Sequence, residues 1–116
     1  MITSIADKDA FQTLLDNNQG IIVLKFGAEW CGPCKQIEEY VSNKFENMPE
    51  SVQTGIIDVD DNFELYAILK RKKIVQALPT IIRYDSDNKS LFPSDSIIGI
   101  DTKKLDNFFN DIIKDA

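Results

Sequence analysis

Residues 21 to 27, with the sequence IIVLKFG, form a nearly continuous apolar run that leads to the only two cysteines of the chain, Cys31 and Cys34. A short apolar run rich in β-branched side chains predicts a central strand that is covered on both faces. A helix is expected to begin around Pro33, because proline lacks an N–H and its fixed φ suits a first helical position. The two cysteines therefore lie where a buried strand passes into a helix.

The rest of the chain alternates β-rich segments with segments whose apolar residues recur at helical spacing. Acidic residues that can cap a helix precede three of the helical segments, and Asp61 and Glu64 are spaced like a capping box. The predicted order is β-α-β-α-β-α-β-β-α, in a single α/β domain that spans residues 1–116. We expect strands at residues 2–5, 21–27, 52–59, 80–84 and 90–98, and helices after Asp7, near Pro33, near Asp60 and after Asp101.

The charge balance and the apolar segments limit the classes of function. The chain has 13 basic and 19 acidic residues, and its net charge of −6 opposes general binding to nucleic acid or to an anionic membrane surface. No apolar run approaches the length of a membrane span. The first residues, MITSIADKD, reach three charged residues before any apolar stretch develops, unlike a signal peptide. We therefore expect a soluble, cytoplasmic protein.

The two cysteines are too few and too close together for a structural role. A bridge between them would close a very short loop, which excludes a stabilising disulfide framework. A structural zinc site usually needs four cysteine or histidine ligands, and the chain has no histidine. Covalent haem attachment needs a histidine after the second cysteine, where this chain has Lys35. Thiol chemistry remains, and we expect no metal site.

The spacing of the cysteines predicts different roles for the two thiols. At the N-terminus of a helix, unpaired N–H groups and the helix dipole stabilise a thiolate, which makes Cys31 the candidate nucleophile. Cys34 lies one turn further along and is expected to face inward, where it can attack the mixed disulfide that Cys31 forms with a substrate. Beside them, Trp30 offers an apolar surface to a polypeptide, Gly32 allows close approach, and Pro33 stiffens the loop.

The segment AEWCGPCK, residues 28–35, closely resembles the active site of thioredoxins. The resemblance covers essentially the whole chain and implies the thioredoxin fold, a central mixed sheet with helices on both faces. Leu78 and Pro79 stand where thioredoxins have a cis-proline, and Gly99 lies in the last strand. The resemblance implies that Pro79 is cis and faces the cysteines, and that Leu78, Pro79 and Gly99 help to bind substrate. An ordinary trans proline that begins a strand is the alternative.

The function that the resemblance implies is reduction of protein disulfides by reversible dithiol–disulfide exchange at Cys31 and Cys34. Electrons would come from NADPH through a thioredoxin reductase, with no cofactor bound to this chain, which would act as a monomer on disulfide-containing proteins. One alternative is a binding module that grips a single partner and for which redox turnover is incidental; a disulfide isomerase or oxidase is another. Asp60 matches a carboxylate that often supports the active-site tryptophan in thioredoxins, although an exposed acid at a strand end would look the same.

Two positions near the cysteines depart from the thioredoxin pattern. Lys25 stands where thioredoxins usually have a buried aspartate, the proton acceptor for the second cysteine, and Gly27 stands where they have an aromatic residue. Strand alternation sends Val23 and Lys25 to the same face, and in the family fold residue 25 lies beneath the second cysteine. We therefore expect Lys25 to be buried, where a lone ammonium would be costly.

A buried lysine needs either an anionic partner or the loss of its proton. Glu38, one helical turn after Cys34, is the candidate partner of Lys25, and Asp58 is the second candidate. In this hypothesis Glu38 moves the proton of Cys34, while Lys25 holds Glu38 in place and favours the nearby thiolate. The alternative is that Lys25 extends its ammonium to solvent and has no catalytic part.

A run of four basic residues, Lys70 to Lys73, ends the helix that precedes Pro79. Cations at a helix C-terminus interact favourably with the helix dipole, so a solvated helix end is the first interpretation. The alternative is that these cations attract acidic substrates.

Overall fold

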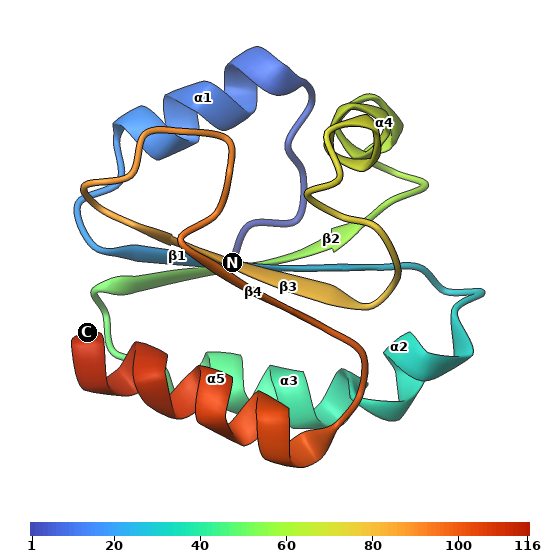
Figure 1. The fold of residues 1–116 in the computed structure, drawn as a ribbon, viewed down its shortest axis with the longest axis vertical. Coiled ribbons are helices and arrows are strands. Elements are labelled where there is room, and N and C mark those ends of the chain that lie inside the picture. Colours follow the sequence, from blue (N-terminus) through green and yellow to red (C-terminus); the bar gives the residue numbers. More distant parts are fainter.

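The computed structural model describes all 116 residues of the chain. Four strands form one sheet, and five helices lie on its two faces (Figure 1). The elements in chain order are α1 (Lys8–Asp16), β1 (Ile21–Gly27), α2 (Gly32–Gln36), α3 (Glu38–Glu46), β2 (Val52–Asp58), α4 (Phe63–Arg71), β3 (Thr80–Asp85), β4 (Asp95–Ile98) and α5 (Thr102–Asp115).

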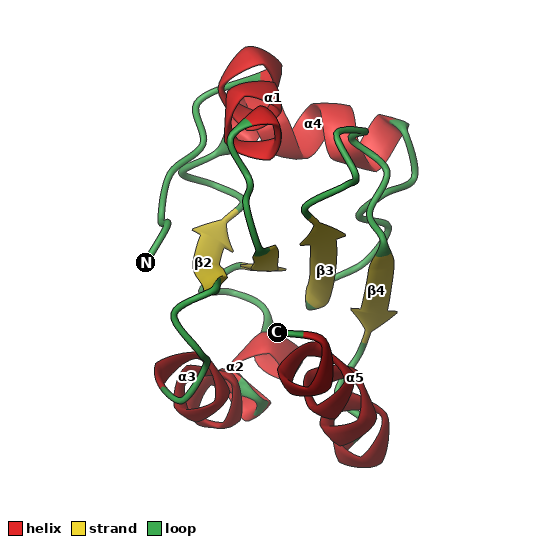
Figure 2. Ribbon diagram, turned by 90° about the vertical axis from the view of Figure 1, so that its left-hand side faces the viewer, coloured by secondary structure: helices red, strands yellow, loops and turns green.

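The sheet is mixed, with the strand order β2-β1-β3-β4. β1 pairs in parallel with β2 and antiparallel with β3, while β3 and β4 form an antiparallel pair. Helices α1 and α4 cover one face, and α2, α3 and α5 lie on the other (Figure 2). This three-layer arrangement confirms the fold class that the sequence predicts.

β1 is the central strand, and all seven of its residues are buried. Its alternation divides its side chains between two cores: Leu24 and Phe26 pack into the core below α1 and α4, and Val23 packs into the core formed with α3 and α5. Burying each such apolar side chain fully stabilises the fold by about 1.5–3 kcal/mol. By the same alternation Lys25 belongs to the face that α2, α3 and α5 cover.

The two acidic caps predicted for the first and last helices are confirmed. The Asp7 carboxylate accepts a hydrogen bond from the N–H of Ala10 at 2.8 Å. The Asp101 carboxylate accepts from the N–H groups of Lys103 and Lys104. Each bond satisfies donors that the first turn of a helix leaves unpaired.

The capping box predicted at Asp61 and Glu64 is wrong. α4 begins one residue later than this pattern requires, and its N-cap is Asn62, which forms no capping bond with the helix. The buried Asn62 amide instead accepts from the N–H of Ile5 at 2.8 Å and donates to the carbonyl of Asp58 at 2.9 Å. A long-range contact with the N-terminal segment has therefore replaced a local cap.

Two predicted strands are shorter by several residues in the structure, and a third, 52–59, ends one residue earlier. The first, at residues 2–5, is reduced to one parallel bridge between Ile2 and Gly55, because the chain leaves the sheet to reach Asn62. The last begins at Asp95 instead of residue 90, since Pro93 precedes it and cannot donate to a ladder. Both changes affect only the edges of the sheet.

The helix predicted near Pro33 is divided at Ile37 into α2 and α3. On the far side of this break, the Tyr40 hydroxyl donates to Asp106 and so joins α3 to α5. Because of the break at Ile37, the five residues of α2 form a separate short helix that follows β1. No helix combines the length and the apolar character that a bilayer span requires.

Candidate active site

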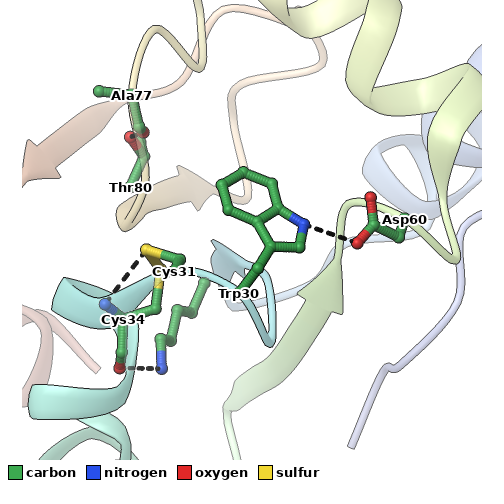
Figure 3. The surroundings of a disulfide bond; sticks show 7 residues. Trp30, Cys31, Cys34, Asp60, Ala77 and Thr80 are labelled. Atoms are coloured by element: carbon green, nitrogen blue, oxygen red, sulfur yellow. Dashed lines mark hydrogen bonds between the residues drawn. A yellow bond between two sulfur atoms is a disulfide. The ribbon is translucent and has the colours of Figure 1, made fainter.

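The two cysteines form a disulfide at the end of β1, with their Cα atoms 5.3 Å apart (Figure 3). Cys31 is the N-cap of α2, and its Sγ accepts a hydrogen bond from the N–H of Cys34 at 3.2 Å. Both residues are buried, with 6% of Cys31 and 4% of Cys34 exposed. The placement of Cys31 before the first turn and of Cys34 within the helix agrees with the prediction.

The solvent side of the disulfide carries an exposed tryptophan. Trp30 is 68% exposed, and its indole N–H donates to the Asp60 carboxylate at 2.8 Å. The carboxylate therefore supports the tryptophan, which decides between the two interpretations of Asp60. Gly32 and Pro33 are also exposed, and the space around Gly32 is open.

The loop before β3 lies across from the cysteines, with Ala77 and Thr80 among the surroundings of the disulfide in Figure 3. The Leu78–Pro79 peptide bond is cis, as the thioredoxin resemblance implies. The Pro79 carbonyl accepts from the N–H of Gly99 at 3.0 Å. Gly99 follows β4 directly and does not lie in the last strand as expected, and its φ of +99° favours glycine. A backbone hydrogen bond thus links Pro79 and Gly99, two of the predicted substrate-binding residues.

On the buried side of the disulfide, Lys25 is only 4% exposed. Its burial is confirmed, and the alternative of an ammonium extended to solvent is wrong. The Lys25 Nζ donates to the carbonyl of Cys34 at 3.5 Å, the bond that a dashed line marks below Cys34 in Figure 3. Burial lowers the pKa of Lys25, and the negative charge of Glu38 opposes this shift.

The ion pair expected between Lys25 and Glu38 is not formed. The two ion pairs within 4.0 Å in the structure both belong to Arg83, which contacts Asp85 and Asp115. Glu38 is exposed at the start of α3, and its influence on Lys25 is a longer-range charge effect. Asp58, the second candidate, also forms no ion pair with Lys25.

These side chains surround a cavity of about 250 Å³ beneath α2. The cavity is polar, and it brings together the predicted proton-transfer residues although they form no ion pair. Its lining consists of Lys25, Gly27, Ala28, Glu29, Cys34, Lys35, Glu38 and Asp58.

Sequence reasoning missed the carbonyl of Cys34 as the partner of Lys25. Every residue has a backbone carbonyl, so no side-chain pattern could single this one out. The positive charge of Lys25 was a usable signal, because the last carbonyls of a helix attract cations and Cys34 lies near the end of α2, which ends at Gln36.

The basic run Lys70 to Lys73, at the C-terminal end of α4, is exposed along its whole length. Lys70 and Arg71 lie in the last turn of α4, Lys72 is its C-cap, and Lys73 has a φ of 62°. This placement agrees with a solvated helix end. The attraction of acidic substrates by these cations stays a prediction.

A disulfide between the N-cap cysteine of a helix and a cysteine one turn further along, with an exposed tryptophan beside it and a cis-proline in the loop across from it, defines a dithiol–disulfide exchange protein. The family model for thioredoxin matches residues 2–111 of the chain. The chain is 31% identical to a thioredoxin of Oryctolagus cuniculus, over 97% of this chain and 100% of that one. It therefore belongs to the thioredoxin family.

Solved thioredoxin structures have the same fold. The X-ray structure of Fasciola hepatica thioredoxin aligns with a TM-score of 0.74 at 27% identity, over 96% of this chain and 99% of that chain. Oxidised mitochondrial thioredoxin 3 of Saccharomyces cerevisiae aligns with a TM-score of 0.72 at 28% identity, over 95% and 94%. The chain is accordingly a protein-disulfide oxidoreductase that uses Cys31 and Cys34, and nothing favours the binding-module alternative.

Proposed function

We propose that the chain is a general protein-disulfide reductase that receives electrons from NADPH through a thioredoxin reductase and passes them, as a cytoplasmic monomer, to disulfide-containing proteins. The observation that carries the proposal is the Cys31–Cys34 pair at the start of α2, with exposed Trp30 on its solvent side. Membership of the thioredoxin family supports a thioredoxin reductase as the electron source, because members are typically reduced by one.

The reaction proceeds through two thiol–disulfide exchanges. The Cys31 thiolate attacks one sulfur of the substrate disulfide, whose other sulfur leaves as a thiolate, and a mixed disulfide forms. The Cys34 thiolate then attacks the Sγ of Cys31, and the second substrate sulfur leaves. Two electrons pass from the protein dithiol to the substrate, and the protein ends with the Cys31–Cys34 bond. The reductase returns two electrons and restores both thiols.

We assign substrate binding to the surface around the disulfide. Leu78 is half-buried, and none of the intramolecular hydrogen bonds uses its backbone N–H or carbonyl. These two groups can therefore pair with an extended peptide, as in strand addition. Beside the disulfide, exposed Trp30 provides the apolar contact. The complete proposed surface consists of Trp30, Gly32, Pro33, Leu78, Pro79 and Gly99.

The experiment that tests the electron source compares two reductants with one disulfide-containing protein substrate. Turnover is measured first with dithiothreitol and then with NADPH and a thioredoxin reductase, where NADPH oxidation follows the rate. Both reductants are expected to support turnover. A Cys31→Ser variant is the control for background reduction.

The two reductants separate two possible failures. Turnover with dithiothreitol alone would refute the reductase and NADPH as electron source while leaving the exchange reaction intact. No turnover above the Cys31→Ser background with either reductant would refute the reductase function. Sedimentation of the reduced protein checks the monomer, and cell fractionation checks the compartment.

A further inference from the structure

Lys25 occupies a place in the sheet where a cation is costly. It lies on the central strand, in register with Ile56 of β2 on one side and Ile81 of β3 on the other. Its ammonium has one hydrogen-bond partner in the protein, the Cys34 carbonyl, and that bond is long at 3.5 Å. A buried amine without an ion pair costs folding free energy, and packing alone would favour an apolar side chain.

Lys25 and Cys34 both come close to residue 27, which has no side chain because it is glycine. A Cβ atom placed on Gly27 would lie 3.3 Å from the Sγ of Cys34 and 3.9 Å from the Cε of Lys25. The end of the lysine chain and the sulfur therefore border the same small volume. A larger residue at position 27 would fill the volume that they share.

The cavity gives this volume a connection with charged groups and water. Cys34 and Lys35 face it from α2, Glu38 from α3 and Asp58 from β2, while Glu29 faces it from the loop after β1. β3 contributes no charged group to the lining, since the residue paired with Lys25 on that strand is apolar. A proton on Lys25 can thus pass to solvent without crossing the apolar cores.

Burial lowers the pKa of the Lys25 amine, which is the direction that a proton acceptor requires. The pKa of Lys25 is lowered by desolvation, and the charge of Glu38 opposes this shift only as the second cause. A lysine with a lowered pKa holds a larger neutral fraction near neutral pH, and a neutral amine can accept a proton.

We propose that the neutral amine of Lys25, which borders the same space as the Cys34 sulfur, accepts the Cys34 thiol proton when Cys34 resolves the mixed disulfide. This inference rests on the proposed function and assigns Lys25 to its second step. The S–H bond of Cys34 breaks, its proton moves to Nζ, and its electron pair attacks Cys31. The substrate sulfur leaves with the electrons of the broken bond, and the proton on Nζ passes through the cavity to water.

The test separates the two steps with dithiobis(nitrobenzoic acid) as the disulfide. The reduced protein releases one thionitrobenzoate when Cys31 forms the mixed disulfide and a second when Cys34 resolves it, so stopped-flow absorbance gives both rates. Three variants separate charge from proton transfer. Lys25→Met has neither function, Lys25→Arg keeps the charge but does not lose its proton, and Lys25→Asp restores a proton acceptor.

We expect Lys25→Met and Lys25→Arg to slow the second release at least about tenfold while the first stays within about twofold of the parent. Lys25→Asp should resolve faster than either. If Lys25→Arg resolves at the parent rate, the charge acts without proton transfer and the proposal is wrong. It is also wrong if Lys25→Met resolves at the parent rate, or if all three variants slow both releases equally.

A measurement on the unsubstituted protein does not depend on the folding of any variant. The Cε and Nζ resonances of Lys25 in isotope-labelled reduced protein give its titration, and the rate of the second release is measured over the same pH range. The two curves are expected to share a midpoint. A Lys25 that stays protonated where resolution is already maximal overturns the proposal, whereas failure of the first release refutes the proposed function.

Discussion

The Cys31–Cys34 disulfide has different surroundings on its solvent side and on its buried side. On the solvent side, Trp30 is exposed and bonded to Asp60, and Leu78 leaves its backbone groups unused. On the buried side, Lys25 and Gly27 adjoin Cys34 within the fold. We expect the first region to contact the substrate, whereas the second adjoins Cys34 and the polar cavity.

This difference shows that residues on one side of an exchange site can change while the other side keeps its pattern. The solvent side follows the thioredoxin pattern, and in the proposed function its backbone groups and apolar surface suit many extended polypeptides. The buried side departs from it at Lys25 and Gly27, where a change affects Cys34 without changing what a substrate touches. Substitutions on the two sides are therefore expected to have separable effects, which three further predictions address.

The largest effect is expected at the cysteines themselves. Cys31→Ser removes the nucleophile and should lower turnover of a protein disulfide at least about 10³-fold. Cys34→Ser leaves the first attack intact and removes resolution, so it should accumulate a mixed disulfide with the substrate. Mass spectrometry and a non-reducing gel measure the trapped species.

The double variant Cys31→Ser/Cys34→Ser is the matched control and should trap nothing. Trapping by Cys31→Ser instead of Cys34→Ser would reverse the roles of the two thiols. The distinction between the solvent side and the buried side would then no longer hold.

An intermediate effect is expected for the stability of the buried side. Lys25→Met replaces the buried amine with an apolar chain of similar length, so unfolding should cost on the order of 1 kcal/mol more at neutral pH. The pKa of Lys25 is lowered in the folded state relative to its ordinary value of 10.5. Urea unfolding of both oxidised proteins across a range of pH measures the difference.

The sign of the pH dependence follows from proton binding. Between the lowered pKa and 10.5 the unfolded chain binds more protons at Lys25, so the parent gains stability as pH rises. Above 10.5 both states are neutral and the desolvation cost of the charge is absent. The advantage of Lys25→Met should therefore be largest below the lowered pKa and shrink as pH rises to 10.5. An advantage that grows with pH would contradict this account.

The smallest effect is expected on the solvent side, at Asp60. Asp60→Ala removes the carboxylate that accepts from Trp30, but both groups are exposed, so stability should change by less than about 0.5 kcal/mol. If the less firmly held indole costs about 0.5 kcal/mol of substrate-binding free energy, KM for a protein disulfide should rise about twofold. The rate of resolution should not change.

Asp60→Asn is the control, because its amide oxygen can still accept the indole bond without the charge. It should show a smaller rise in KM than Asp60→Ala. A slower second release of thionitrobenzoate in either variant would show that the two sides of the disulfide are coupled.

Most of the fold could be predicted because its main elements depend on local patterns. The apolar run of β1 requires a place between two cores, and the caps Asp7 and Asp101 bond to N–H groups two or three residues away. The pair Cys31 and Cys34 excludes most alternatives to thiol chemistry by number and spacing. The cis bond before Pro79 was different, since it followed from family resemblance and not from any local pattern.

The sequence by itself thus determined the central strand, the caps of the first and last helices and the thiol pair, all of which depend on residues a few positions apart. The tertiary structure alone decided the partners of side chains that reach across the fold. Asn62 bonds to Ile5 instead of capping its helix, and the Lys25 ammonium bonds to the Cys34 carbonyl instead of pairing with Glu38. The physical reason is that these partners include backbone groups, which every residue carries and which only the folded chain brings within reach.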